Sequence, residues 1–371
     1  MEKKRWIAWL SVAGAALGVH YLMLILACFA IQGGFSFSGL AQLIHDRLTQ
    51  PGDAVRYLDI AKNGYVRAGE NAINLVFYPL YPYLIRGLSW LTGSLEAAGL
   101  MLSQFSYAGA SVLLYELLLP EQGQQRAWEG VLLLALYPFS MFAIGVYSEG
   151  LFLLLTIGCL YALRRRNFLA AGCVGFLAAL TRVQGMLLLF PAVYEAVALR
   201  LGPEKRKIQG RDAALLLIPA GFCVYLGINY ALHGDCFQFL RYEADAPWYQ
   251  TSKWIGENIA RQYEMARAHA GLSLIIYWPQ IALYFLALAV LFWGYRQGAR
   301  MSDLLYGGVY LGFTFLSGWM ISGGRYMMSC VPLFILLAGM EEGLGKRALF
   351  AAEGMLFFAY SLFFLMGHAI M

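Results

Sequence analysis

The stretch MEKKRWIAWLSVAGAALGVHYLMLILACFAI, residues 1–31, joins a short basic segment to a long apolar run from Trp6 to Ile31. A helix needs about 20 apolar residues to cross a bilayer, and this run is too long for the core of a cleaved signal peptide. Leu26-Ala27-Cys28 loosely resembles a lipoprotein cleavage site, but cleavage there would remove the first helix. An uncleaved first transmembrane helix is the better interpretation.

The composition of the whole chain also indicates a membrane protein. Of its 371 residues, 60% are hydrophobic and 13% are charged, whereas soluble proteins carry about 25% charged residues. The formal net charge is +5. The basic residues lie in short clusters between apolar runs, which is typical of membrane topology and does not suggest a nucleic-acid partner.

Similar apolar runs recur along the chain, each near the length needed to span a membrane. We therefore predict an all-α, multi-pass integral membrane protein with about eleven transmembrane helices, forming one membrane-embedded domain over residues 1–371. The expected spans are 6–31, 97–119, 127–144, 147–163, 168–181, 183–199, 213–232, 273–294, 304–321, 326–340 and 348–368.

The short basic segments alternate along the chain in a way that predicts the topology. If the N-terminus is cytoplasmic, five further segments that are rich in Lys and Arg also face the cytoplasm, as the positive-inside rule requires. These segments are 120–126, 164–167, 200–211, 295–300 and 341–347. Two long loops, 32–96 and 233–271, then fall on the extracytoplasmic side, and loops of that size usually have a function.

Cysteine and histidine show no pattern that predicts a disulfide or a metal site. The six cysteines are scattered, mostly inside apolar runs, and the five histidines do not cluster. Free cysteines in such runs are typical of small packing residues. We expect no disulfide, no metal and no cofactor.

The first loop contains the most informative segment, QPGDAVRYLDIAKNGY, residues 50–65. Asp53 follows Pro-Gly, which favours the start of a helix, and Asn63-Gly64 favours a left-handed cap at its end. Arg56, Tyr57 and Ile60 share a face with Asp53 at helical spacing. The pattern predicts a short amphipathic helix at the outer membrane surface. Alternatively, Asp53 is only an N-cap and Asp59 only a solvated charge.

The segment FYPLYPYLIR, residues 77–86, places aromatic residues beside two prolines that are three positions apart. These prolines are expected to prevent a regular helix. The segment is consistent with a chain that dips into the outer interface, where Tyr78 and Tyr81 would line a lipid path. A belt of aromatic residues on a kinked span is an equally good interpretation.

In the second loop, RYEADAPWY, residues 241–249, mixes charged and aromatic residues. Trp248 and Tyr249 suit stacking on a sugar ring, but they suit the membrane interface slightly better. Glu243 and Asp245 are an isolated acidic pair, not an Asp-x-Asp motif.

Together, these segments resemble the PIG-V-type mannosyltransferases. The family's first loop reads approximately W-D-x-x-x-Y-x-x-I-A-x-x-G-Y and is followed by F-P-L-Y-P. Three later motifs also match in order along most of the chain. The matching residues are Asp53, Tyr57, Ile60, Ala61, Gly64, Tyr65, Tyr137-Pro138, Tyr147–Phe152, Ala179–Gly185, Gly324–Tyr326 and Pro332. The chain departs from the family at Gly52, where a Trp is usual.

The resemblance implies a GT-C fold with catalysis on the extracytoplasmic side and a polyprenyl- or dolichyl-phosphate sugar as donor. It implies a glycosyltransferase, with mannose as the expected sugar and a glycolipid or glycan as the acceptor. The size and the short N-terminus favour a bacterial member in the plasma membrane, in contact with membrane lipids.

Residue roles follow as hypotheses. Asp53 is the expected base, since an inverting transfer needs one carboxylate near the acceptor oxygen. Asp59 is a second candidate, but six residues along a helix place it away from Asp53. Arg182 and Arg325 are expected to bind the leaving phosphate, because an arginine at the edge of the membrane is costly unless it is paired or functional.

The remaining candidates support the same chemistry. Glu149 would orient Arg182 or bind a sugar hydroxyl, and a purely structural pairing of Glu149 with Arg182 is the alternative. The other substrate-binding candidates, which are otherwise explained as structural or interface residues, are Arg56, Tyr57, Tyr78, Tyr81 and Tyr326, with Arg241 as a weaker one.

Two other classes of protein compete with a transferase. A secondary transporter would have repeated halves and helices broken at matching positions, and the sequence contains neither. A structural membrane protein would explain the spans but not an aspartate beside a doubly proline-bent aromatic segment. Among transferases, a different lipid-linked sugar, such as arabinose or glucose, is the alternative.

Overall fold

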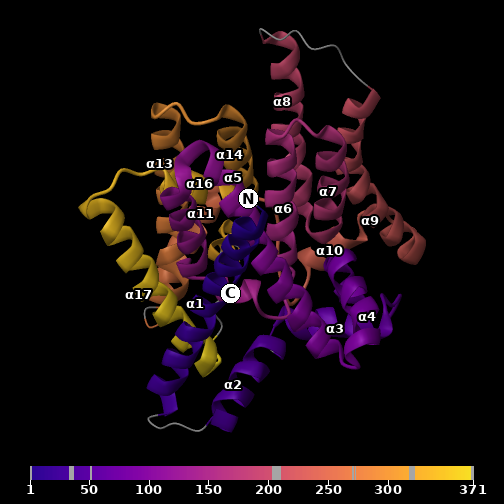
Figure 1. Cartoon of the computed structure of the whole chain (residues 1–371). Helices are drawn as coiled ribbons and strands as arrows, with labels where there is room; N and C mark the ends of the chain where they lie inside the picture. The colour runs from indigo at the N-terminus through magenta and orange to yellow at the C-terminus, as the bar shows by residue number, and fades with distance from the viewer. Residues whose placement is uncertain are drawn as a thin grey trace.

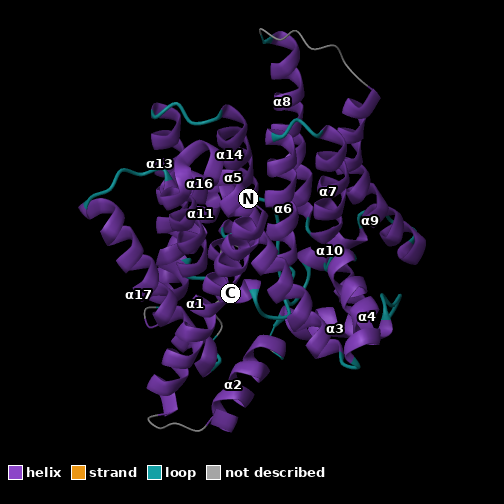
Figure 2. Cartoon of the chain, viewed as in Figure 1, coloured by secondary structure: helices purple, strands orange, loops and turns teal. Residues whose placement is uncertain are grey.

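The computed structural model describes residues 2–32, 37–50, 52–202, 210–269, 271, 273–316 and 322–368. Within these ranges every regular element is a helix, and Figure 2 shows helices joined by short loops. The first half of the chain, in order, comprises α1 (Glu2–Gln32), α2 (Phe37–Thr49), α3 (Asp53–Asn63), η1 (Glu70–Val76), α4 (Leu80–Thr92), α5 (Leu95–Leu136), η2 (Ser140–Ala143), α6 (Glu149–Arg164), α7 (Phe168–Thr181), η3 (Val183–Leu188) and α8 (Leu189–Leu201). The second half comprises η4 (Gly210–Leu216), α9 (Leu217–His233), α10 (Gln238–Ala244), α11 (Ile255–Ala268), η5 (Ser273–Tyr277), α13 (Trp278–Arg296), α14 (Met301–Leu316), α15 (Gly323–Met327), α16 (Val331–Ala338) and α17 (Leu344–Met366).

Six helical stretches within the described residues are long and apolar enough to cross a bilayer. They are Lys4–Ile31, Leu95–Leu136, Val183–Leu201, Asp212–His233, Ser273–Arg296 and Leu344–Met366, and a shorter apolar helix covers Phe168–Thr181. The chain is therefore a multi-pass, all-α membrane protein, as its composition predicts. The number of eleven spans stays a prediction, and residues 317–321 of one expected span and 203–209 of one basic segment lie outside the described residues.

The expected spans 97–119 and 127–144 are not two separate helices, and the second does not reach residue 144. Both belong to α5, which is interrupted at Gly123 (φ 82°, ψ 172°), three residues after Pro120. The second part ends at Leu136, so the expected end at 144 is wrong. Residues 137–148 instead form a buried, mostly irregular segment around η2. Irregular backbone at this depth is tolerated because it is enclosed by protein.

Glycine allows α7 and α9 to pack with almost no gap between their backbones. A Cβ atom at Gly221 of α9 would lie 2.3 Å from the Phe176 carbonyl oxygen of α7, and one at Gly172 of α7 would lie 2.0 Å from that of Ala214 in η4, which leads into α9. Small residues at such crossings let membrane helices gain close van der Waals contact. This packing fixes α7, and with it the position of Arg182 at its C-terminus.

The two kinds of loop lie at opposite ends of the bundle (Figure 1). The connections α6–α7 and α13–α14, which are among the segments expected to be cytoplasmic, lie at the upper end of the view. Helices α2, α3 and α4 of the first long loop lie at the lower end. The arrangement agrees with the alternation of loops expected from the charges.

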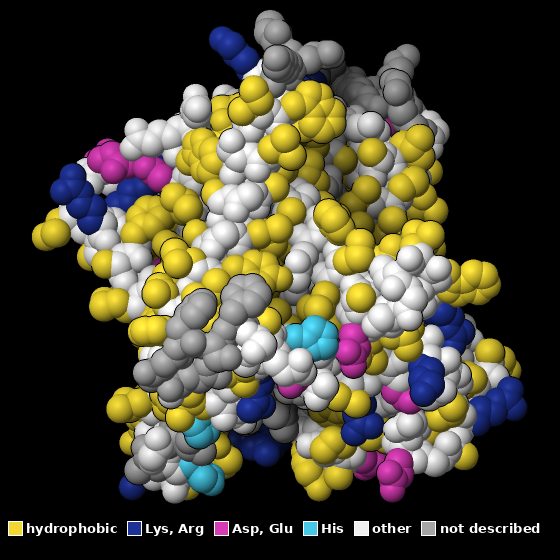
Figure 3. Space-filling model, turned by 60° about the horizontal axis from the view of Figure 1, so that its bottom comes forward, with side chains coloured by type: hydrophobic (Ala, Val, Ile, Leu, Met, Phe, Trp, Pro, Cys, Tyr) yellow, Lys and Arg dark blue, Asp and Glu magenta, His cyan; other side chains and the backbone are white. Residues whose placement is uncertain are grey.

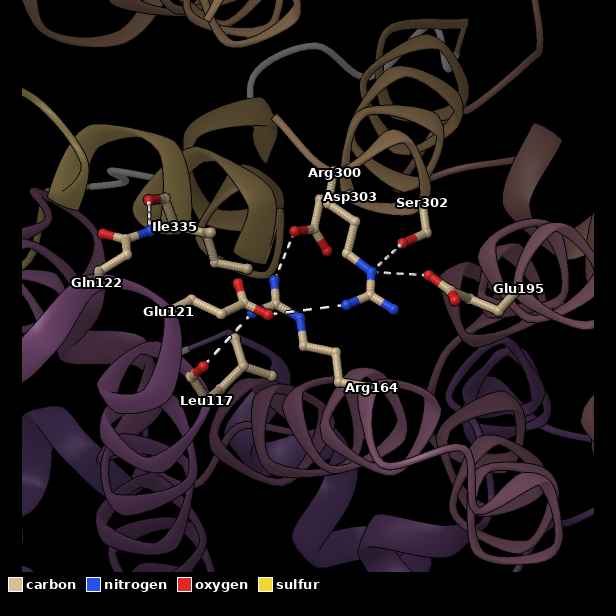
Figure 4. Close-up of polar contacts among 9 residues, drawn as sticks. All are labelled: Leu117, Glu121, Gln122, Arg164, Glu195, Arg300, Ser302, Asp303 and Ile335. Atoms are coloured by element: carbon tan, nitrogen blue, oxygen red, sulfur yellow. Dashed lines mark hydrogen bonds and ion pairs between the residues drawn. The ribbon is translucent and has the colours of Figure 1, made fainter. Parts of the chain in front are cut away.

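A network of ion pairs joins residues of four helices (Figure 4). The Arg164 guanidinium contacts Glu121 Oε2 at 2.7 Å and Asp303 Oδ2 at 2.5 Å. Arg300 Nε contacts Glu195 Oε1 at 2.8 Å. Because Arg164 and Asp303 are almost completely buried, each requires the other, and the network holds the ends of α5, α6, α8 and α14 together.

Replacing Gly221 with Val tests the close packing of α7 on α9. We expect a loss of stability of about 1–3 kcal/mol or more, because the new side chain meets a backbone carbonyl that cannot turn away. Gly227→Val in the same helix is the matched control, since a Cβ there has nothing within 4 Å. Thermal unfolding in detergent measures both, and equal melting temperatures for the two variants would contradict the packing described.

Candidate active site

The first loop folds into the short amphipathic helix that the sequence predicts. Helix α3 begins at Asp53 and buries the face formed by Ala54, Tyr57 and Ile60. Gly64 ends it, and its N–H donates to the Ile60 carbonyl at 2.8 Å. Gly64 has the expected positive φ of 76°, but its ψ of −173° lies outside the left-handed helical region.

Gly52, which precedes Asp53, stands at the position where the PIG-V-type motif has a Trp. It occupies the N-cap position with φ 58° and ψ −125°, a backbone conformation that favours glycine and strains a bulky residue. Asp53 is therefore the first helical residue and not the N-cap. A tryptophan at position 52 would require a different turn into the helix.

The expectation that the two prolines prevent a regular helix is wrong. Helix α4 begins at Leu80 with Pro79 as its cap, and Pro82 lies in the first turn. Proline is tolerated there because N–H groups of the first turn have no partner within the helix. Tyr78 and Tyr81 are 6% and 0% exposed, so they do not form an exposed aromatic belt.

Four charged side chains from distant parts of the chain meet at one point. Glu149, the first residue of α6, is completely buried. Its Oε1 atom accepts from Arg182 Nη1 at 2.8 Å and also from Arg325 Nε. Arg325 Nη1 contacts Asp53 Oδ2 at 2.6 Å. We call Asp53, Glu149, Arg182 and Arg325 the charged centre.

Aromatic rings enclose the two arginines of the charged centre. The Arg325 guanidinium lies 4.9 Å from the ring centres of both Phe142 and Tyr147. The Arg182 guanidinium lies 4.9 Å from the ring of Tyr326. These cation–π contacts fix the planes of both guanidinium groups and partly replace the water that they lose on burial.

The charges within the centre compensate one another. Two arginines face two carboxylates, so the centre is neutral in sum. Burying such groups is costly, and the cost is tolerated only when every charge has partners. Arg325 Nη2 and Glu149 Oε2 are nevertheless buried without a hydrogen-bond partner in the described part of the chain. The centre therefore keeps unused hydrogen-bonding capacity.

Tyr57 and Tyr81 attach the first loop to the start of α6. The Tyr57 hydroxyl donates to Ser148 Oγ at 2.8 Å, next to Glu149. The Tyr81 hydroxyl lies 2.7 Å from Ser103 Oγ, and the two tyrosine rings meet edge to face with centres 4.9 Å apart. Burial raises the pKa of Tyr57, which keeps it a neutral donor. These contacts place Asp53 over Arg325.

Asp59 lies apart from the charged centre. Its carboxylate accepts from Asn63 Nδ2 at 2.7 Å and Asn74 Nδ2 at 2.8 Å, beside a separate, smaller cavity. Asn74 in turn accepts from Arg56 Nη1 at 3.3 Å. This network holds η1 on α3 and gives both carboxylate oxygens of Asp59 structural partners.

A cavity of about 1310 Å³ opens beside the charged centre. Of the residues expected from the sequence, those that line it are Asp53, Arg56, Tyr57, Tyr78, Arg182, Arg325 and Tyr326. Glu149 and Tyr81 lie behind this wall, and Asp59 lies elsewhere. The cavity is larger than most small-molecule pockets, which measure about 300–1,000 Å³. Figure 3 turns the lower end forward and shows charged side chains there among hydrophobic ones.

The second loop contributes another wall of the cavity, and of its residues the sequence suggested only Trp248 for stacking on a sugar ring, with the membrane interface as the slightly preferred alternative. Glu243, Trp248, Lys253 and Trp254 line the cavity, and α10 packs against η1 of the first loop. Burial raises the pKa of Glu243 to about 7. Arg241, the weaker candidate, instead pairs with Asp235 at 2.9 Å and is 72% exposed.

Two further lining residues were also missed. Arg47, near the end of α2, faces the cavity and donates from Nε to the Leu365 carbonyl at 3.1 Å. Tyr147 lines it beneath Arg325. Tyr147 begins the Tyr-Ser-Glu motif that resembles the PIG-V-type proteins, which was its only signal, and nothing near Arg47 gave one.

The described ranges contain no group of three or more His, Cys, Asp or Glu side chains arranged to hold a metal ion. All six cysteines are free thiols. The side chains that line the cavity include carboxylates, guanidinium groups and aromatic hydroxyls.

Comparisons with known proteins find similarity in structure but not in sequence. No protein-family model matches the chain, and no curated protein matches it. The crystal structure of ArnT from Cupriavidus metallidurans, bound to undecaprenyl phosphate, superposes with a TM-score of 0.54 and 15% identity over 89% of this chain. The apo oligosaccharyltransferase of Archaeoglobus fulgidus gives a TM-score of 0.46 and 12% identity, over 92% of this chain and 56% of its own.

The likeness to ArnT shows the fold. This chain spans about 60% of the length of ArnT, and its helices follow the GT-C type of membrane fold that the sequence led us to expect. Identity at this level carries no information on the substrate.

Glu149→Gln tests whether the buried carboxylate holds the charged centre together. Removing one partner of a buried ion pair costs about 3–5 kcal/mol, because Arg182 then loses its carboxylate partner and Asp53 alone compensates two buried arginines. We expect a clearly lower melting temperature in detergent than for Glu257→Gln, an exposed glutamate on α11.

A double-mutant cycle with Arg182→Met separates this pairing from general damage. The double variant should lose less stability than the sum of the two single variants, because it removes both charges of one pair. Strict additivity, or a Glu149→Gln variant as stable as the control, would contradict the pairing.

Proposed function

We propose that this chain is a glycosyltransferase that moves a sugar from a polyprenyl-phosphate donor to a hydroxyl of a lipid-linked or glycan acceptor. The observation that carries the proposal is the charged centre beside the cavity, in which Asp53 faces the open space and two arginines lie directly behind it. A carboxylate next to paired guanidinium groups suits a reaction in which a hydroxyl is deprotonated while a phosphate leaves.

Asp53 is the proposed base. One of its oxygens, Oδ2, is fixed by Arg325, and its side chain is 28% exposed toward the cavity. The other oxygen is available to accept the proton of the acceptor hydroxyl. The acceptor oxygen then attacks the anomeric carbon, and the bond from that carbon to the phosphate oxygen breaks with its electron pair leaving on the phosphate. Attack opposite the leaving group inverts the anomeric configuration.

Arg325 and Arg182 are the proposed partners of the leaving phosphate. A guanidinium group carries five N–H donors and matches phosphate oxygens in a forked geometry. Arg325 Nη2 has no partner among the described residues, and a phosphate oxygen would satisfy it. Glu149 then has a positioning role, because its Oε1 atom holds both guanidinium groups in fixed planes.

The class of donor has independent support. The ArnT structure that shares this fold contains undecaprenyl phosphate, which is a polyprenyl phosphate without a sugar. The cavity combines a charged centre with apolar walls from α10, α14 and α17, including Phe239, Phe313 and Phe364. Such walls suit the first isoprene units next to a phosphate.

The sugar and the orientation are the finer parts of the proposal. The ordered motifs shared with PIG-V-type proteins favour mannose. The basic segments favour a cytoplasmic N-terminus in a bacterial plasma membrane, with the first loop and the cavity on the extracytoplasmic side. A glycolipid or glycan is the expected acceptor, and the whole chain acts as one membrane-embedded domain.

Sugar transfer in vitro tests the proposal. The purified protein in detergent receives polyprenyl-phosphate mannose and a membrane-lipid extract as the acceptor pool. Wild type should form a mannosylated product, and Asp53→Asn should lower the rate by about 10²–10⁴-fold through loss of the base. Asp59→Asn, with its carboxylate in a separate cavity, is the comparison and should keep most of the activity.

Each other outcome has a definite meaning. Full activity of a folded Asp53→Asn variant would contradict the assignment of the base but not the enzyme class. No transfer by wild type would first direct the assay to other lipid-linked sugars, and failure with all of them would favour a transporter.

A further inference from the structure

One corner of the cavity has polar groups that the proposed reaction does not use. It is formed by Tyr78 at the start of α4, Gln184 in η3, and Glu243 and Trp248 in the second loop, all of which line the cavity. We call these four residues the second-loop corner. None of them forms an ion pair in the described part of the chain.

The Tyr78 hydroxyl is the clearest sign of a missing partner. The side chain is 6% exposed, and its hydroxyl is buried without a hydrogen bond to any of the residues that the structure describes. Its ring stacks on Tyr225 with centres 4.0 Å apart. Burial raises the pKa of Tyr78 well above its ordinary value, and the nearby Glu243 carboxylate adds to this. An unsatisfied hydroxyl beside a carboxylate is a pair that a bound ligand would complete.

The groups of the corner are fixed in place before any ligand binds. Val183, adjacent to Gln184, packs against the cluster of Tyr78, Tyr225 and Phe239. The Glu243 carbonyl accepts from Gln250 N at 2.7 Å, which closes the loop that carries Trp248. The Trp248 ring meets the Phe77 ring edge to face with centres 6.0 Å apart. A rigid aromatic wall with polar groups at one side is typical of a preformed binding site.

The corner also borders the charged centre. Gln184 follows Arg182 by two residues, and Phe77 meets the ring of Tyr57 with centres 5.0 Å apart. Tyr57 in turn bonds to Ser148 beside Glu149. A ring held in the corner would therefore lie next to the groups that are proposed to act on the anomeric bond.

We propose that the second-loop corner binds the hydroxyl groups of a sugar ring, an inference that rests on the proposed function. A carboxylate, an amide and a phenol together can both donate to and accept from neighbouring ring hydroxyls. The flat face of Trp248 covers the apolar face of the ring. The corner lacks an uncompensated arginine, which separates it from the phosphate end of the cavity. The sugar is that of the donor or that of the acceptor.

Binding measurements with two lipids test the donor case. The probes are polyprenyl-phosphate mannose and undecaprenyl phosphate, which differ in the sugar. Glu243→Ala and Tyr78→Phe should each weaken binding of the sugar-bearing lipid by roughly three- to tenfold, and leave binding of the bare lipid phosphate within about twofold. Asp245→Ala, an exposed residue of the same loop that does not line the cavity, is the matched control.

Transfer kinetics test the acceptor case. If the corner holds the acceptor sugar, both lipids bind the variants as they bind wild type, and the concentration of lipid extract needed for half-maximal transfer rises roughly three- to tenfold. Melting temperatures close to that of Asp245→Ala establish that the variants are folded. Glu243→Gln should lose less than Glu243→Ala in either case, because an amide still bonds to hydroxyls; equal losses in the two variants would show that the charge and not hydrogen bonding to hydroxyls is needed, and would overturn the proposal.

Failure of the inference and failure of the proposed function give different results. If wild type transfers mannose and both variants match it in lipid binding and in acceptor dependence, the corner has no role in sugar binding, and the proposed function stands. If wild type transfers no sugar from any polyprenyl-phosphate donor and does not distinguish the two lipids, both are contradicted.

Discussion

The site depends on one buried carboxylate that serves two arginines. Glu149 has no exposure to solvent, and its Oε1 atom receives both Arg182 and Arg325. Without it, two guanidinium groups would be buried side by side with only Asp53 to compensate them. The irregular segment 137–148 places the start of α6, and with it Glu149, inside the bundle. Tyr57 attaches the first loop beside this point. The position of Asp53 is thus a consequence of the position of Glu149.

The general fold is readable from the sequence because membranes impose simple rules. Apolar length predicts helices, and the basic clusters predict which loops share an end. The details that failed were those decided by backbone geometry. Gly123 joins two expected spans within one interrupted helix, and Pro82 falls in the first turn of α4, where proline is harmless. Residue types alone do not show where a helix begins, so neither the continuation of α5 beyond Gly123 nor the place of Pro82 in the first turn of α4 could be predicted.

The candidate site could likewise be predicted only in part from the sequence. Glu149, Arg182 and Arg325 could be selected from the sequence because a charge at the end of an apolar run is costly and needs a reason. Asp53 could be selected from its position in the first-loop motif and from the family resemblance. Their mutual contacts, which span 272 positions from Asp53 to Arg325, could not be selected, since they depend on how α3, α6, α7 and α15 pack. Arg47 gave no signal, and Glu243 was noted only as part of an isolated acidic pair with Asp245. Each looks like an ordinary loop or surface charge until the fold brings it to the cavity wall.

The most direct measurement is an experimental structure of the Asp53→Asn variant in a lipid nanodisc with polyprenyl-phosphate mannose bound. The variant is chosen because it should bind the donor without consuming it. The account predicts that the phosphate lies in the cavity within hydrogen-bond distance of Arg182 or Arg325, with the anomeric carbon facing residue 53. A donor phosphate bound outside the cavity, with the two arginines still paired to Glu149 and far from it, would contradict the account.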